Sequence, residues 1–73
     1  MKIIVNLDVM LAKRKMKLKD LAKAVELSEQ NLSMIKTGKV KGMRFETLAK
    51  ICDVLDCQPG DLLEFDPETS QAN

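Results

Sequence analysis

The sequence predicts a small all-α domain of five short helices, with or without a short strand at its N-terminus. Apolar residues recur at intervals of three and four along most of the chain, which is the period of a helix buried on one side. The apolar fraction of 45% is typical of a folded chain and not of a disordered one. Two Phe are the only aromatic residues, so the core must consist of aliphatic side chains, which favours packed helices.

The length of 73 residues corresponds to one domain, near the size at which folding buries only about 60% of the extended surface. We expect a single domain over residues 1–73, with a core of about residues 3–65 and a frayed polar tail at residues 66–73. Because the core is small, dimerisation could contribute to its stability.

The β-branched run Lys2–Val5 predicts a short strand before the first helix. Its partner would be Leu62–Phe65 near the other end of the chain or the same segment of a second subunit, because a lone strand leaves its backbone groups unpaired. The alternative is that this run simply extends the core.

The first helix should run from about Asn6 to Met16, with Asn6 or Asp8 as its N-cap. Its inward side chains are Leu7, Met10 and Leu11, and the cations Lys13, Arg14 and Lys15 point outward near its end. A basic last turn suits the helix dipole, which explains these three cations without reference to a ligand.

Two short helices joined by a tight turn follow between Leu18 and Gly38. The first of them buries the i, i+3, i+4, i+7 set of Leu18, Leu21, Ala22 and Val25. Ser28 is a preferred N-cap for the second, which covers about residues 28–37. Its inward side chains are Leu32 and Ile35, its outward stripe is Gln30, Ser33, Met34 and Thr37, and Gly38 suits the left-handed conformation that ends a helix.

Residues 45–55 predict a fourth helix whose role is to fill the core. Its apolar stripe consists of Phe45, Leu48, Ala49, Cys52 and Leu55, so Cys52 is expected to be a small buried hydrophobe with a reduced thiol. Gln58 and Pro59 open a fifth helix, in which the residues from Gly60 to Leu63 complete one or two turns.

The stretch Leu18–Gly38 resembles the DNA-binding helix-turn-helix of the Xre/Cro/lambda-repressor family of prokaryotic and phage regulators. The matching residues are Leu21 and Ala22, Leu27 and Ser28 at the turn, Leu32, Ser33, Ile35 and Gly38, and the match continues into LAKICDVLDCQPGDLLEF. This resemblance implies a compact five-helix lambda-repressor-like domain. Glu26 stands where the family usually has Gly, which predicts either a wider turn or a positive φ at Glu26.

Charge is strongly polarised along the chain. Residues 1–50 hold all 12 basic residues and five acids, a net charge of +7, whereas residues 51–73 hold the other six acids and no basic residue, a net charge of −6. A basic half that contains a helix-turn-helix is the footprint expected for a phosphate backbone, although solvated surface charge would give the same pattern.

The resemblance places Glu29, Gln30 and Met34 at positions that commonly face base edges. Gln30 could pair with adenine N6 and N7, Glu29 could accept from cytosine N4, and Met34 could contact a thymine methyl or be an exposed or protein-contacting Met. Ser33 could serve bases or phosphates, and we count it with the base contacts. The candidate phosphate contacts are Lys17, Lys19, Lys36, Thr37, Lys39, Lys41 and Arg44.

Other classes of function lack the residues that they need. With no His, no Gly-rich phosphate loop and no evident carboxylate pair, we expect no enzyme. Cys52 and Cys57 lie five apart without a His, so we expect no metal site and no cofactor. The apolar N-terminal run is too short for a signal peptide or a membrane span, and two free thiols are typical of a cytoplasmic protein.

Together these features predict a cytoplasmic transcriptional regulator that binds specific double-stranded DNA. One module of this size reads only a few base pairs, so we expect a homodimer on two half-sites, with the Ile3–Val5 and Leu63–Phe65 segments as the candidate interface. The alternative is a protein-binding module, such as an antitoxin-like or accessory partner, that uses the same fold. We expect neither a membrane nor a small-molecule substrate as partner.

Overall fold

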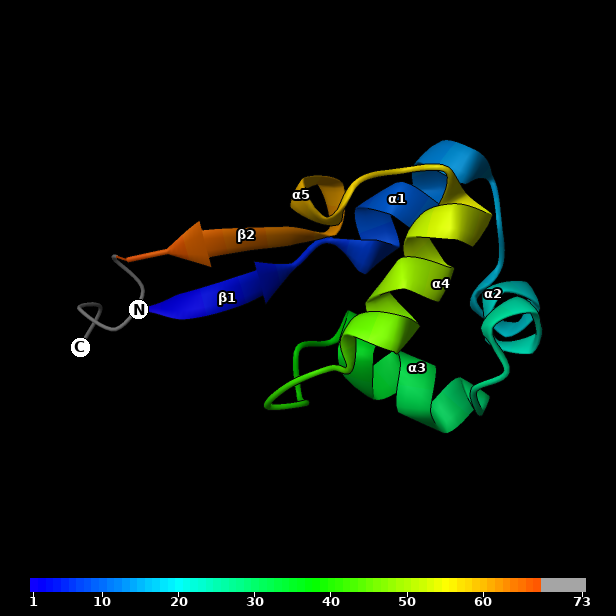
Figure 1. Cartoon of the computed structure of the whole chain (residues 1–73), viewed down its shortest axis with the longest axis horizontal. Coiled ribbons are helices and arrows are strands. Elements are labelled where there is room, and N and C mark those ends of the chain that lie inside the picture. The colour runs from blue at the N-terminus through cyan, green and yellow to red at the C-terminus, as the bar shows by residue number, and fades with distance from the viewer. Residues whose placement is uncertain (68–73) are drawn as a thin grey trace.

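The computed structural model describes residues 1–67 and contains a cluster of five helices with a projecting two-stranded hairpin (Figure 1). The elements are β1 (Lys2–Val5), α1 (Leu7–Arg14), α2 (Leu18–Val25), α3 (Glu29–Lys36), α4 (Phe45–Leu55), α5 (Pro59–Leu62) and β2 (Leu63–Asp66). The prediction of a helical domain with five helices is confirmed, and a hairpin takes the place of a single strand. None of the helices in the described part is long and apolar enough to cross a membrane.

The core is aliphatic and lies where α1, α2, α3 and α4 meet. Its buried side chains are Leu7, Met10, Leu11, Leu21, Ala22, Val25, Leu32, Ile35, Ile51, Leu55 and Leu62. The inward residues expected for the first three helices are therefore buried, except that Leu18 is half-buried at the start of α2. Each fully buried Leu, Ile or Val stabilises the fold by about 1.5–3 kcal/mol relative to an exposed one.

The hairpin ties the two ends of the chain together. β1 and β2 are antiparallel, with Ile3 opposite Phe65 and Val5 opposite Leu63. The backbone N–H of Asn6 donates to the carbonyl of Leu62 at 2.7 Å, which fixes the point where the hairpin joins the helices. The predicted strand is confirmed, and its partner is the C-terminal segment of the same chain.

The expected tail at residues 66–73 begins one residue too early. Asp66 is the last residue of β2, and it pairs with Lys2, the first residue of β1. The rest of the expected tail from residue 68 onward lies outside the described residues.

Non-glycine residues in the left-handed conformation end three of the helices. They are Lys15, Glu26 and Asp56, with φ values of 54°, 62° and 51°. The N–H of the residue after each returns to the helix, as Leu27 does to the carbonyl of Ala22 at 3.0 Å. The first helix consequently ends at Arg14 rather than at Met16, because the reversal at Lys15 stops it two residues early.

Helix α4 packs on a side that overlaps only in part with the one that its sequence predicts. Ile51 and Leu55 are buried, Leu48 and Cys52 are half-buried, and Phe45 and Ala49 are exposed. The expected core stripe is therefore correct at Leu55, which is buried, and in part at Leu48 and Cys52, which pack against the core, but wrong at Phe45 and Ala49. The helix carries two overlapping apolar stripes, and the core also takes Ile51 from the second one.

Helix α5 is a single turn. The Asp61 carboxylate accepts from the backbone N–H of Gln58 at 2.9 Å, and Pro59 occupies the first helical position. Leu63, which was expected to continue this helix, instead begins β2, because pairing with Val5 provides its backbone groups with partners.

Candidate DNA-binding surface

The turn between α2 and α3 is fixed by local hydrogen bonds. Glu26 adopts φ 62° and ψ 40°, so the positive-φ alternative is the correct one and the turn stays tight. Ser28 has an extended backbone, and its Oγ accepts from the N–H of Asn31 at 3.0 Å, as expected of an N-cap. These two residues set the direction in which α3 leaves α2.

The exposed side of α3 carries the four candidate base contacts. Leu32 and Ile35 are buried, whereas Glu29 and Gln30 in its first turn are exposed. One turn on, Met34 is 39% exposed and Ser33 is half-buried. The structure therefore brings the four candidates onto the solvent side of one helix, with Ser33 the least accessible of them.

The side-chain hydroxyl of Thr37 already donates its hydrogen bond to the end of α3. Its Oγ1 donates to the carbonyls of Ser33 at 3.0 Å and Met34 at 3.3 Å. Phosphate oxygens are acceptors, so a phosphate contact by this side chain requires a different rotamer. Lys36 is half-buried on the flank of the same helix.

A hollow of about 360 Å³ lies beside α3 and joins it to the following loop. Met34 and Asn31 line it from α3, and Arg44 lines it from the start of α4. Asn31 was not predicted from the sequence. Its place three residues before Met34, on the same flank of the helix, is the pattern that could have identified it.

The candidate phosphate contacts lie at two ends of this surface. Lys17 is the N-cap residue of α2 and Lys19 lies in its first turn, and both are exposed. Asp20 shares that turn, so the cost of cations at a helix N-terminus is partly offset. On the other side of α3, Gly38 takes φ +75° and the loop after it exposes Lys39 and Lys41.

Arg44 and Lys41 border different hollows, although they lie three residues apart. Arg44 lines the hollow beside α3, whereas Lys41 lines another of about 230 Å³ beside the hairpin. The loop therefore directs Arg44 toward the same surface as Met34 and places Lys41 at its edge.

Two other cations of the basic half have partners within the protein. The guanidinium of Arg14 donates to the carbonyls of Leu55 and Asp56 at the end of α4. Lys50 Nζ lies 3.6 Å from Glu26 Oε1, an exposed pair of the kind that contributes about 0–1 kcal/mol. The net charge of residues 1–50 therefore overstates the positive charge that is free to meet a ligand.

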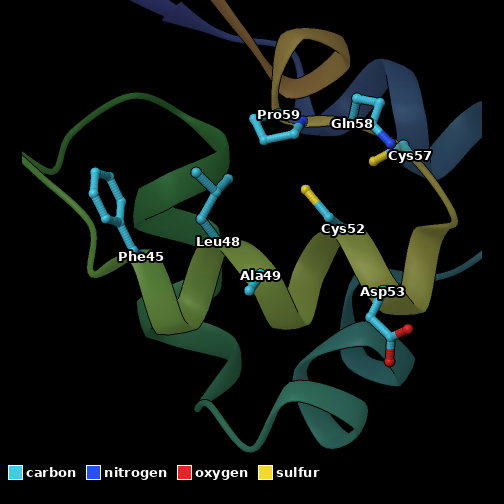
Figure 2. A pocket seen from close by; sticks show the side chains of 8 residues that line it. All are labelled: Phe45, Leu48, Ala49, Cys52, Asp53, Cys57, Gln58 and Pro59. Atoms are coloured by element: carbon cyan, nitrogen blue, oxygen red, sulfur yellow. The ribbon is translucent and has the colours of Figure 1, made fainter.

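Cys52 and Cys57 are free thiols that line one hollow on the far side of α4 (Figure 2). Burial raises the pKa of the Cys57 thiol, and the neighbouring Cys52 thiol raises it further. Cys52 is half-buried and packs against the core, so its expected burial is met in part. Within residues 1–67 no three His, Cys, Asp or Glu side chains lie together in a way that could hold a metal ion.

Comparison with known proteins agrees with this geometry. The family of the Cro/C1-type HTH DNA-binding domain matches residues 6–68. An uncharacterized HTH-type transcriptional regulator, YozG of Bacillus subtilis (strain 168), is 54% identical over 65 residues, which cover 89% of this chain and 77% of YozG. A crystal structure of a candidate DNA-binding protein from Bacteroides fragilis superimposes with a TM-score of 0.77 at 22% identity, over 86% of this chain and 100% of that one, and shows the fold. The alternative of a protein-binding module is not favoured by these relatives.

Proposed function

This chain belongs to the family of Cro/C1-type helix-turn-helix DNA-binding domains, and from that membership we propose that it regulates transcription by binding specific duplex DNA with α3 in the major groove. Its 54% identity to a protein named as an HTH-type transcriptional regulator supports the regulatory role. This family is a class of DNA-binding regulators and not of enzymes. The cytoplasm, where prokaryotic DNA lies, is the compartment that this role implies.

The observation that carries the proposal is the exposed side of α3. A helix fits the major groove, where each base pair presents a distinct set of donors, acceptors and methyl groups. Helix α3 buries only Leu32 and Ile35 and leaves Gln30 and Met34 accessible to a ligand. The N-cap bond from Asn31 N–H to Ser28 fixes the first turn of the helix, so Gln30 is presented from a rigid element.

Each candidate base contact has a matching chemical target. Gln30 suits adenine, whose N6 and N7 form a donor and acceptor pair. Glu29 suits the N4 amino group of cytosine, and Met34 suits the methyl group of thymine. The Ser33 hydroxyl can donate a hydrogen bond to a base or accept one from it. Because Ser33 is half-buried, its short side chain reaches less far than the other three.

Phosphate contacts would hold the helix in the groove from both sides. In this proposal Lys17 and Lys19 at the start of α2 would contact one strand, and Lys39 and Arg44 after α3 would contact the other. Lys36 on the flank of α3 and Lys41 at the edge of the loop would add positive charge near the phosphates. Thr37 would contact a phosphate only after a change of rotamer. No metal or cofactor enters this mechanism.

We further propose that the functional form is a homodimer on two half-sites. One α3 reaches only a few base pairs, and dimers of helix-turn-helix proteins place their two recognition helices about one helical turn, roughly 34 Å, apart on the DNA. The cognate site is then expected to be an inverted repeat.

The test is a binding titration with random duplex DNA at low and high salt, followed by selection of sites from a random library. We expect salt-sensitive binding to any duplex and enrichment of an inverted repeat in the selected pool. Absence of binding to duplex DNA at low salt contradicts the proposal.

A further inference from the structure

Phe45 is the most exposed large apolar residue in the described part of the chain, and two other exposed ones lie on the hairpin. Phe45 is 87% exposed at the first position of α4, and Ile3 and Phe65 on the hairpin are 56% and 58% exposed. Ile3 pairs with Phe65 in the register, so the two side chains lie next to each other on one face of the ribbon. We call these three residues, with the hollows beside them, the Phe45 face.

The hairpin and α4 contribute to one continuous surface. The hollow of about 230 Å³ is lined by Ile3, Val5 and Leu63 from the hairpin and by Phe45 and Leu48 from α4. A second hollow, of about 660 Å³, is also lined by Phe45 and Leu48, together with Cys52 (Figure 2). Phe45 therefore borders two apolar hollows.

The size of this face is that of an interaction site. An aromatic residue has about 150–250 Å² of accessible surface when fully exposed, and we take a similar value for Ile3. At the stated fractions, Phe45, Ile3 and Phe65 together expose roughly 400 Å² of apolar surface. Monomeric proteins rarely expose contiguous apolar patches beyond a few hundred Å². Doubled across a pair of subunits, and with the walls of the hollows added, this area approaches the roughly 1,200 Å² of a small stable interface.

We propose that the Phe45 face is the surface on which a second copy of this chain docks, with Phe45 of each copy inserted into a hollow of the other. This inference deepens the homodimer of the proposed function and rests on it. A two-fold interface must be complementary to itself. Phe45 projects beside two hollows with mostly apolar linings, so each copy offers both the inserted side chain and the hollow that receives it.

The charges on the face suit the same arrangement. Among the residues that line the two hollows, only Asp53 and Lys41 are charged, and they border opposite hollows. Either hollow can therefore take Phe45 of the second copy with a single charged residue at its border.

Docking on this face leaves the candidate base contacts free. None of Glu29, Gln30, Ser33 and Met34 lines either of these two hollows. Met34 instead lines the hollow that adjoins α3. A dimer joined through the Phe45 faces therefore leaves the base-contact side of both α3 helices uncovered, and of the candidate phosphate contacts only Lys41 borders the docking surface.

The experiment is sedimentation equilibrium of the full chain without DNA, from 1 to 100 µM, for the wild type, Phe45→Ser and Val9→Ser. Val9 is a matched control, because it is a large apolar residue on α1 that is 46% exposed and lines neither hollow. We expect a wild-type dimer, an unchanged Val9→Ser dimer and at least a tenfold larger dissociation constant for Phe45→Ser. Far-ultraviolet circular dichroism should be the same for all three proteins, because Phe45 contributes little to the core.

A wild type that stays monomeric at 100 µM, or a Phe45→Ser dimer as tight as the wild type, overturns the inference. If Phe45→Ser fails to fold, Phe65→Ser takes its place with the same expected outcome. Binding of duplex DNA is measured separately on the same samples. A monomer that still binds duplex DNA contradicts only the interface, whereas a dimer that binds no duplex DNA contradicts the proposed function and leaves the interface standing.

Discussion

Arg14 at the end of α1 donates from Nε to the backbone carbonyl of Leu55 at 2.6 Å, and its Nη2 donates to the carbonyl of Asp56 at 2.9 Å. These carbonyls belong to the C-terminus of α4, where the helix dipole leaves partial negative charge. The last turn of α4 contains no basic residue of its own. Arg14 therefore supplies the missing cation from another helix and bonds to a residue that lies 41 positions away in the chain.

Replacing Arg14 by Met should destabilise the domain, because it removes two charge-assisted hydrogen bonds while keeping most of the apolar side chain. The expected loss is about 1–3 kcal/mol in the free energy of unfolding, measured by urea titration. Lys13→Met is the control, since Lys13 is an exposed neighbour of the same charge. It should lie within about 0.5 kcal/mol of wild type. Equal losses in the two variants would show that only net charge matters.

The strained turn at Glu26 predicts an unusual preference for Gly. Both Glu26→Ala and Glu26→Gly lose the contact with Lys50, but only Gly adopts φ 62° without steric cost. The Gly variant should be more stable than the Ala variant by about 1 kcal/mol in thermal or urea unfolding. At Lys23, an exposed interior position of α2, the same comparison should have the opposite sign. A matching sign at both sites contradicts the left-handed assignment.

Gln30→Ala tests the candidate reader of bases. We expect a loss of about 1–3 kcal/mol in binding to the selected site and a relaxed preference at one base position. Val9→Ala, on the exposed side of α1, should bind the same site as tightly as the wild type. Unchanged affinity together with unchanged base preference removes Gln30 from the base contacts.

Lys39→Ala tests the loop after α3 as a phosphate clamp. The loss of one phosphate contact should weaken binding to every sequence alike and lower the slope of log K against log salt by about one. Lys13→Ala is the control of equal charge, because Lys13 is exposed on α1 and does not line the hollow beside α3. It should leave the slope unchanged. Equal slopes for Lys39→Ala and wild type argue against the clamp.

The raised pKa of Cys57 predicts slow alkylation of the folded protein. At pH 8 its thiolate should be scarcer than in the unfolded chain, so iodoacetamide should modify it more slowly without urea than with it. Cleavage before Asp53 and Asp56 separates Cys52 from Cys57 for mass spectrometry. Equal rates in the two states contradict the effect of burial.

The same shift links this thiol to stability at alkaline pH. The folded-state pKa of Cys57 lies above that of the unfolded chain. Its contribution to stability is therefore complete below the unfolded-state pKa and is lost as the pH rises through the folded-state pKa.

The features that the sequence determined are those whose causes lie within a few residues. The apolar spacing of Leu21, Ala22 and Val25 defines a buried face of α2, and the hydroxyl of Ser28 reaches the N–H of Asn31 three residues on. Gly38 takes the positive φ that ends α3. For the same reason the exposed stripe of α3 could be located before the structure was known, and the family resemblance placed the candidate base contacts on that helix.

Only the tertiary structure decided the features that depend on distant neighbours. Helix α4 has two apolar stripes, and packing of the core buries Ile51 while it leaves Phe45 in solvent. Local periodicity cannot choose between two stripes, because both satisfy the helical repeat. The partner of β1 and the bonds from Arg14 to the end of α4 are likewise set by which segments the core brings together. The sequence therefore specifies the reading helix by itself, whereas the Phe45 face exists only because the packed core leaves it uncovered.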